Sequence, residues 1–438
     1  MFNIKDINNK IFLNASWLFG DKSASSIFTA LQTVITARIL GVDDYGLLVL
    51  VIAYIDIINQ FFDFRVWETA VKYIGSFWES GEEEKTRSMI KLSYLIDISS
   101  GILAFVIAIA VSKLISKYII HSPTAYEYIW IYSFSLFVDT ANSTSIAILR
   151  VFNKYRSIAF IRSSQALFRL VIVSILLVIG CGIKGVLFGY IVASFLGFFI
   201  RMLVINRTLT EHQLGKWWNA KLDLIRNHMK GIVWFLGNTS LAATVRIGED
   251  KFFGTLIIGY FAGKDAVAYY NVATSVAKLV NFIVDPLYEA LYPDLVKIKT
   301  LNALREIQNV IKHITKKLML IIIPIIVIII IFSELIVKLI FGTDYLPASN
   351  ALKVIAAAIL IARMTFWINP LLLAMEKPGL RTMLGVISTS VYLILLFILV
   401  PSYSYIGAGF AYLGFSVIKS SLSVYLFNNL FKTANEQK

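Results

Sequence analysis

Arginine side chains inside long apolar segments are the residues of this sequence best suited to a chemical role. Arg162, Gln165 and Arg169 are spaced i, i+3 and i+7, so a helix places all three on one face. A guanidinium group stays charged at any working pH and grips phosphate oxygens with two parallel hydrogen bonds. Charged groups at bilayer depth are costly and normally face a bundle interior or a wet cavity. The spacing therefore predicts a cationic face along such a cavity.

Acidic and amide side chains form similar polar faces in two other apolar segments. The first face carries Asp56, Gln60 and Asp63, and the second carries Lys278, Asn281, Asp285 and Glu289, again at helical spacing. Asp63 and Asp285 are the candidates for coupling transport to an ion, and pairing with a nearby arginine is the alternative role for each.

Further ionisable residues interrupt other apolar segments. One cluster holds Arg246, Glu249, Asp250 and Lys251, in which Arg246 and Asp250 at i, i+4 can neutralise each other. Arg363 lies well inside another segment, where a position at the membrane surface does not explain it. Additional candidates for a central cavity are Arg38 and Arg65, with Asp21, Asp97 and Asp139 as their partners or as proton carriers. Arg38 and Arg65 can instead lie at segment ends and reach lipid phosphates.

The composition predicts a polytopic membrane protein. Of the 438 residues, 58% are hydrophobic and 16% are charged, which is too apolar for a water-soluble surface. A single cysteine, Cys181, excludes an internal disulfide, and the four histidines have no spacing suited to metal binding. We therefore expect neither a metal nor a redox cofactor.

About twelve segments reach the length of about 20 residues that an apolar helix needs to cross the hydrocarbon. They are predicted near residues 12–39, 45–66, 89–112, 125–149, 156–180, 184–205, 233–262, 266–293, 314–341, 349–375, 379–400 and 405–431. The predicted fold class is an all-α membrane protein.

The positive charges of the loops predict the orientation in the membrane. The N-terminus and every second loop carry roughly 25 basic residues, against about 4 in the other loops, so both termini should face the cytoplasm. The formal net charge of +14 then reflects basic loops near anionic lipid, and no nucleic-acid partner is needed to explain it.

An internal repeat divides the chain into two halves. Asn59 and Asp63 recur as Asn281 and Asp285 at an offset of about 222 positions, and Leu40-Gly41 recurs as Ala262-Gly263 at the same offset. We predict six-helix bundles over residues 1–206 and 233–438. The cytoplasmic linker 207–232 is expected to be either an amphipathic helix on the inner leaflet or a plain connector. Duplicated bundles are a common plan among transporters, which place the substrate path at the repeat interface.

Several strings resemble the multidrug/oligosaccharidyl-lipid/polysaccharide (MOP) exporter superfamily, in particular its Wzx-type O-antigen and polysaccharide flippases. They are ARILGVDDYGLL (37–48), IIGYFAGKDAVAYYNVA (257–273), LIFGTDYLPASNALKVIA (339–356), LAMEKPGLR (373–381) and YIGAGFAYLG (405–414). Together these strings are distributed over nearly the whole chain. The resemblance implies a V-shaped pair of bundles, like that of the multidrug and toxic-compound extrusion (MATE) transporters, around a cationic cavity that opens alternately to each side.

The cargo implied by this resemblance is an undecaprenyl-pyrophosphate-linked repeat unit, flipped from the cytoplasmic to the periplasmic leaflet of a bacterial inner membrane. On that reading the diphosphate or acidic sugars contact Arg162, Arg169, Arg246, Lys251 and Arg363, and sugar hydroxyls bond Gln60, Gln165 and Asn281. The coupling ion would be H⁺ or Na⁺. Besides the bilayer, the expected partners are a polysaccharide polymerase and chain-length proteins of lipopolysaccharide biosynthesis.

Three other functions are weighed against this one. A MATE-type drug or cation antiporter should have a cavity dominated by carboxylates, and the arginines in the spans argue against it. A lipid II flippase is expected to have spans beyond twelve. An integral membrane glycosyltransferase or polymerase needs a sizeable exterior loop with catalytic groups, and the exterior loops here are short. We therefore expect a transporter that is not an enzyme.

Overall fold

Helices make up the secondary structure of the described chain. The computed structural model describes residues 4–64, 66–247, 251–300 and 304–436, and no strand occurs in these ranges. The α-helices are α1 (Ile4–Phe62), α2 (Val66–Glu79), α3 (Glu83–Tyr118), α4 (Ala125–Ser133), α5 (Leu136–Thr140), α6 (Asn142–Val151), α7 (Tyr155–Val178), α8 (Gly182–Glu211), α9 (Met229–Ile247), α10 (Lys251–Ala277), α11 (Asn281–Thr300), α12 (Leu304–Ile331), α13 (Ser333–Phe341), α14 (Ala348–Met364), α15 (Ile368–Ala374) and α16 (Pro378–Glu436). The 3-10 helices are η1 (Trp217–Asn219), η2 (Leu222–His228), η3 (Lys278–Val280) and η4 (Thr343–Tyr345).

Eight helical stretches of the described chain are long and apolar enough to cross a membrane. They are Ala24–Glu79, Glu83–Tyr118, Tyr155–Val178, Gly182–Glu211, Phe253–Asp285, Arg305–Ile331, Ala348–Ala374 and Pro378–Phe431. Three of these stretches, Ala24–Glu79, Phe253–Asp285 and Pro378–Phe431, each include parts of two expected spans, joined through a bend at Gly41, Gly263 or Ser404. The prediction of an all-α transmembrane fold is confirmed.

Two glycine bends have matching backbone geometry. Gly41 in α1 has φ 75° and ψ 179°, and Gly263 in α10 has φ 82° and ψ 177°. Only glycine adopts this region without steric cost, because it has no Cβ. The two glycines are the pair that the repeat superimposes in the sequence, so the duplication extends to the backbone conformation.

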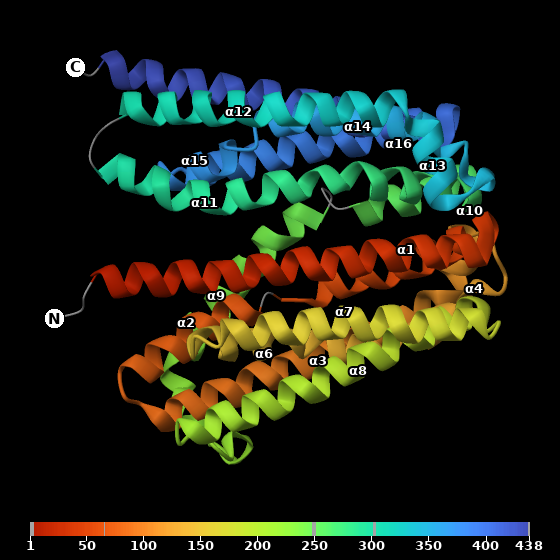
Figure 1. Ribbon diagram of the computed structural model, residues 1–438. Coiled ribbons are helices and arrows are strands. Elements are labelled where there is room, and N and C mark those ends of the chain that lie inside the picture. The colour runs from red at the N-terminus through yellow and green to blue at the C-terminus, as the bar shows by residue number, and fades with distance from the viewer. Residues whose placement is uncertain (1–3, 65, 248–250, 301–303, 437–438) are drawn as a thin grey trace. The chain divides into compact units, whose positions relative to one another are not determined.

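The chain divides into two compact units. Unit 1 consists of Met1–Leu40 and Val51–Thr244, and unit 2 consists of Gly41–Leu50 and Val245–Lys438. Within unit 1, α7 packs along α8 and α2 packs against α3 and α6. Within unit 2, α14 lies beside α16, and both contact α10 (Figure 1).

The first turns of the helix after Gly41 lie very close to α10 inside unit 2. The side chains of Asp43 and Lys264 form an ion pair at 2.6 Å, and the Tyr45 hydroxyl donates to the Asn271 Oδ1 atom at 2.8 Å. A Cβ added to Gly46 would lie 2.0 Å from the Lys264 carbonyl oxygen. A glycine at position 46 is therefore required for this approach.

The segment between α8 and α9 is anchored in the core of unit 1. Leu214 and Ile225 are fully buried in a hydrophobic cluster with residues of α2, α3 and α6. The Trp217 ring stacks on the Tyr94 ring of α3, with centroids 4.8 Å apart. Instead of one continuous helix, residues 217–228 form η1 and η2, which follow the surface of α3.

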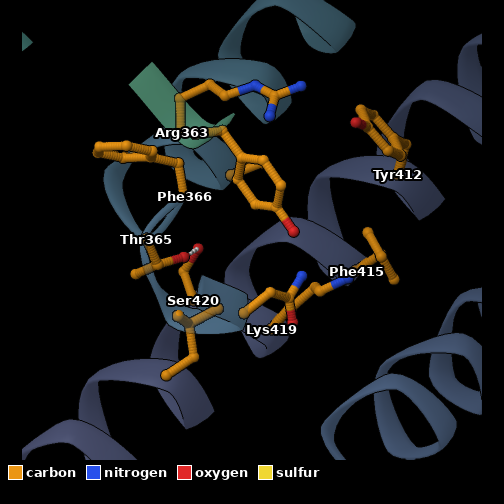
Figure 2. A pocket seen from close by; sticks show the side chains of 11 residues that line it. Arg363, Thr365, Phe366, Tyr412, Phe415, Lys419 and Ser420 are labelled. Carbon is orange, nitrogen blue, oxygen red and sulfur yellow. Dashed lines mark hydrogen bonds between the residues drawn. The ribbon is translucent and has the colours of Figure 1, made fainter. Parts of the chain in front are cut away.

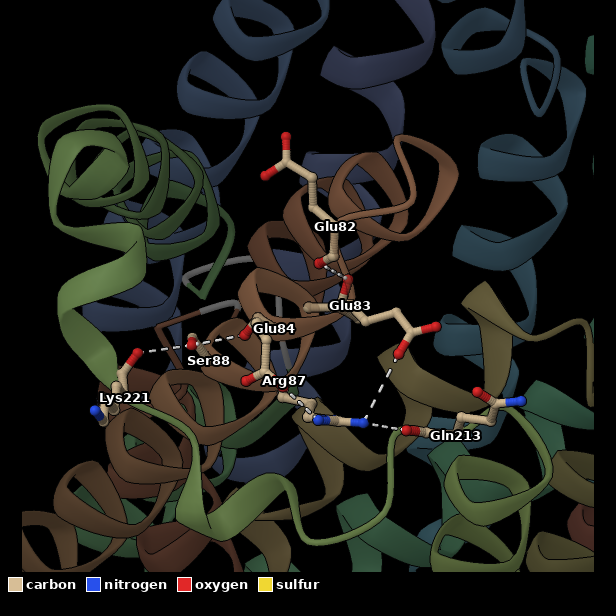
Figure 3. A network of polar contacts seen from close by, with 8 residues as sticks. Glu82, Glu83, Glu84, Arg87, Ser88, Gln213 and Lys221 are labelled. Carbon is tan, nitrogen blue, oxygen red and sulfur yellow. Dashed lines mark hydrogen bonds and ion pairs between the residues drawn. The ribbon is translucent and has the colours of Figure 1, made fainter.

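Polar side chains of α3 hold the backbone of this same segment. The Ser88 hydroxyl donates to the Lys221 carbonyl oxygen at 2.8 Å, and Lys91 Nζ donates to the Ala220 carbonyl oxygen at 2.9 Å. Arg87 donates to the Gln213 carbonyl oxygen and pairs with glutamates one turn before it (Figure 3). These hydrogen bonds give donors to backbone carbonyl oxygens that would otherwise have none, because this segment is not part of a continuous helix.

The Trp217→Ala substitution should destabilise unit 1 by about 2 kcal/mol, because truncating a half-buried tryptophan removes the stacking partner of Tyr94. Thermal unfolding of the purified protein in detergent measures this loss. Trp218→Ala is the matched control, since the neighbouring Trp218 is 53% exposed. Equal effects of the two substitutions would contradict the anchoring role of Trp217.

Candidate functional site

A pocket within unit 2 gathers cationic, aromatic and hydroxyl side chains. Its volume is about 250 Å³, and it lies between α11, the end of α14, α15 and the second half of α16 (Figure 2). The lining residues are Tyr288, Ala362, Arg363, Thr365, Phe366, Ile368, Asn369, Tyr412, Phe415, Lys419 and Ser420.

Arg363 occupies the last turn of α14, where the helix dipole favours a positive charge. Its Nη2 atom donates to Asn281 Oδ1 at 2.7 Å, which ties α14 to the start of α11. Its Nε atom is buried and has no hydrogen-bond acceptor in the described chain. Arg363 therefore brings a positioned positive charge to the pocket.

The opposite wall is a single face of α16. Tyr412, Phe415 and Lys419 are spaced i, i+3 and i+7, which places them on one side of the helix. The rings of Tyr412 and Phe415 stack with centroids 5.9 Å apart, and Lys419 Nζ lies 5.0 Å from the Phe415 centroid. Figure 2 shows these three side chains on the α16 ribbon, with Arg363 across the pocket from Lys419.

Two hydroxyl groups lie at the base of the pocket. Thr365 Oγ1 and Ser420 Oγ are 3.0 Å apart, and Ser420 also donates to the Ile361 carbonyl oxygen at 3.0 Å. No residue that lines the pocket carries a carboxylate. The side chains that line the pocket are therefore suited to bind an anionic, partly apolar ligand.

Unit 1 contains a separate polar network around Arg169. The Arg169 Nε atom donates to Gln32 Oε1 at 2.8 Å, and its Nη2 atom donates to Thr29 Oγ1 at 2.9 Å. Gln32 in turn donates to the Tyr190 hydroxyl at 2.7 Å, and the Arg169 guanidinium lies 5.3 Å from the Tyr190 ring centroid. Protein groups thus hold the Arg169 side chain on three sides.

Arg201 is a buried arginine that the sequence analysis did not select. It is 5% exposed on α8, donates from Nη1 to Gln165 Oε1 at 3.3 Å, and leaves Nε and Nη2 without acceptors in the described chain. Of the charged groups around Arg201, Asp139 interacts with it most strongly, and Asp139 also interacts with Arg169. The signal was a lone arginine inside an apolar span, the same signal that identified Arg363.

The Arg201→Met substitution should destabilise unit 1 by about 2 kcal/mol, because it removes the main counter-charge of the buried Asp139. Adding Asp139→Asn should recover more than half of this loss, since no carboxylate then needs a partner. Thermal unfolding of the two single variants and the double variant gives the coupling energy. Strictly additive effects would show that the two side chains do not interact.

The two ion-coupling candidates lie in different units. Asp63 accepts a hydrogen bond from the Ser143 hydroxyl at 3.2 Å and lies in unit 1 near the buried Asp97. Asp97 in turn accepts the backbone N–H of Thr144 at 3.0 Å. Asp285 is half-buried on α11 in unit 2. No group of three or more His, Cys, Asp or Glu residues in the described chain is arranged to bind a metal.

The structure brings together some of the predicted substrate contacts and separates others. Arg363 and Asn281 form a hydrogen bond in unit 2, and Gln165 bonds with Arg201 in unit 1. Gln60 is half-buried on α1 in unit 1, and Arg162 is exposed on α7. The side chains of Arg246 and Lys251 lie outside the described structure. The role of each as a substrate contact stays a prediction.

The fold matches solved transporters of the MOP superfamily. The chain aligns with the lipid II flippase MurJ in an inward closed conformation with a TM-score of 0.76 and 17% identity, over 94% of this chain and 87% of that one. An inward-facing MATE family multidrug resistance transporter gives a TM-score of 0.73 and 12% identity, over 94% of this chain and 96% of that one. The protein therefore has the transmembrane MOP fold, as the sequence predicted.

Family membership follows from the sequence comparison. Residues 35–350 match the family described as polysaccharide biosynthesis protein, and the chain belongs to this family. A relative is the probable low-salt glycan biosynthesis flippase Agl15 of Haloferax volcanii, 30% identical over 155 residues, which are 35% of this chain and a third (33%) of that protein. Inner membrane protein YghQ of Escherichia coli is 20% identical over 288 residues, which cover 66% of this chain and 81% of that protein.

Proposed function

We propose that the protein is a flippase for a lipid-linked oligosaccharide. The observation that carries this proposal is the cationic, aromatic pocket around Arg363 in a membrane protein of the polysaccharide biosynthesis family. The relative Agl15, described as a probable glycan biosynthesis flippase, supports the same function. The cargo is an undecaprenyl-pyrophosphate-linked repeat unit of an O-antigen or related polysaccharide, moved from the cytoplasmic to the periplasmic leaflet of a bacterial inner membrane.

The physical task of such a protein is to lower the desolvation barrier for an anionic headgroup. An unaided diphosphate or sugar acid would lose its hydration in the hydrocarbon at a prohibitive cost. Fixed cations along a wet path replace that hydration, and arginine suits this role because its charge persists and its fork fits phosphate oxygens. The two halves of the repeat would open the path to each leaflet in turn, and Arg162, Arg169, Arg246, Lys251 and Arg363 are the proposed cations.

Polar and acidic groups complete the proposed path. Gln60, Gln165 and Asn281 would bond sugar hydroxyls, and Asp63 or Asp285 would bind a coupling ion, H⁺ or Na⁺. Transport along such a path needs no catalytic residue. A membrane potential that is negative inside favours outward movement of an anion by about 2.3 kcal/mol per charge per 100 mV.

Depletion of the protein in its host tests this function. Surface polysaccharide should disappear, while lipid-linked repeat units accumulate on the cytoplasmic leaflet, where an impermeant periodate reagent added to spheroplasts does not oxidise them. A plasmid copy of the gene should reverse both effects. Unchanged surface polysaccharide after depletion, in a strain with no other exporter of the same family, would refute the proposal.

A further inference from the structure

The pocket in unit 2 has room for one part of a lipid-linked glycan. Its volume of about 250 Å³ is below the range of about 300–1,000 Å³ that is usual for complete small-molecule sites. A repeat unit of several sugars with its diphosphate and lipid is far larger than this. The pocket can therefore enclose one ring-sized group, and the rest of the cargo must lie outside it.

The aromatic lining indicates that the enclosed group has an apolar face. Four of the lining residues are aromatic: Tyr288, Phe366, Tyr412 and Phe415. The face of an aromatic ring carries a negative partial charge, so it attracts the C–H groups of a pyranose ring and repels a bare anion. A free phosphate has no apolar face to place against these rings, and a sugar ring does.

The two cations indicate that the ring also carries a negative charge. Arg363 is held by Asn281, which fixes the position of its guanidinium group at the pocket. The Lys419 ammonium group lines the same pocket, and no lining residue supplies a carboxylate. A carboxylate or phosphate oxygen accepts a stronger hydrogen bond from a guanidinium or ammonium group than the hydroxyl of a neutral sugar does.

The remaining polar groups match sugar hydroxyls. Thr365 and Ser420 bond to each other, and each hydroxyl oxygen can accept a further hydrogen bond. The Asn369 amide adds both donors and an acceptor to the wall. The pocket thus combines aromatic side chains, hydroxyl groups and positive charges in a space of about 250 Å³.

We infer that this pocket binds a single pyranose ring that carries a carboxylate or a phosphate group, and that it selects cargo by this charged sugar. The inference rests on the proposed flippase function for the origin of the sugar. Binding itself requires no transport. The two sources of the charge, a uronic acid in the repeat unit or a sugar joined to phosphate, share the same recognition chemistry.

Titration calorimetry on the purified full-length protein in detergent tests the inference with glucuronate, glucose 6-phosphate, glucose and inorganic phosphate as probes. Glucuronate or glucose 6-phosphate should bind at least tenfold more tightly than glucose and inorganic phosphate. The tighter of the two anionic sugars identifies the source of the charge. Equal binding of glucose, equal binding of inorganic phosphate, or no binding of either anionic sugar would overturn the inference.

Pocket variants with matched controls locate the binding. Arg363→Met and Tyr412→Leu should each weaken binding of the preferred sugar at least tenfold. Arg305→Met and Tyr425→Leu should leave it unchanged, because Arg305 and Tyr425 are exposed side chains of the same unit outside the pocket. If the controls weaken binding as much as the pocket variants do, the sugar binds elsewhere.

The binding test and the depletion test fail independently. Sugar binding by a protein whose depletion leaves surface polysaccharide intact would refute the flippase function and keep the pocket assignment. Loss of surface polysaccharide on depletion, together with no sugar binding, would refute the pocket assignment alone.

Discussion

Replacing Arg363 by methionine is expected to reduce export of the glycan at least tenfold without lowering the amount of protein in the membrane. A hydrogen bond to a charged group contributes about 1.5–3 kcal/mol, which corresponds to roughly 10-fold to 150-fold in binding. Methionine keeps an unbranched apolar side chain that reaches about as far as the arginine Nε atom, so the packing of α14 should survive. Surface polysaccharide in a depleted host carrying the variant gene measures the effect.

Arg305→Met is the matched control for this prediction. It makes the same chemical change at an exposed position of α12 in the same unit and should leave export unchanged. Arg363→Lys adds information about geometry, because lysine keeps the charge but lacks the planar fork. We expect it to restore only part of the export. Normal export by Arg363→Met would exclude this arginine from the substrate path.

Replacing Gly46 by alanine is expected to destabilise unit 2 by about 3 kcal/mol. The added methyl group would lie 2.0 Å from the backbone oxygen of Lys264, and a backbone atom cannot move away as a flexible side chain can. The helix after Gly41 must then separate from α10, with loss of the contacts that Asp43 and Tyr45 make there. Thermal unfolding in detergent measures the change.

Gly237→Ala is the control for the cost of a methyl group in a helix. Gly237 lies in α9, and a Cβ built there meets no atom within 4 Å. Alanine should stabilise that helix by about 0.5–1 kcal/mol, because glycine loses more conformational freedom on folding. A Gly46→Ala protein as stable as the parent would mean that the two helices do not approach as described.

Local sequence signals were sufficient to predict the helical class, the repeat and one pocket residue. Long apolar segments leave a membrane helix as the stable conformation, because each backbone group must find its partner within the segment. The repeat was visible in Asn59 and Asn281. Arg363 was identified because a charged side chain deep in a membrane span is energetically costly and usually has a functional role. Each of these arguments uses one segment, or a comparison of two segments.

The residues that line the pocket could not be predicted from the sequence, because such a prediction needs to know which helices are neighbours. Tyr412, Phe415 and Lys419 share one face of α16, but the sequence does not show that this face meets the end of α14. The burial of Arg201 depends on contacts with Gln165 in the same way. Helical spacing predicts which side chains lie together on one helix, whereas the partner helix is decided by packing over the whole bundle.

The segment between the halves shows the same limit. Its tryptophans among basic residues were compatible with a membrane-surface helix or a plain connector, because amphipathic composition suits both. The side chain of Trp217 instead stacks on Tyr94, and Ser88 fixes the backbone at Lys221. These tertiary partners lie more than a hundred positions earlier in the chain, beyond the reach of a local pattern.

The matched bends at Gly41 and Gly263 have a consequence for the origin of the chain. Lys264, the partner of Asp43, corresponds to position 42 of the first half when the offset of 222 between the two glycines is subtracted. The contact therefore joins nearly equivalent positions of the two copies of the repeat. Duplication of one half-length sequence accounts for the same glycine bend at equivalent positions of the two halves.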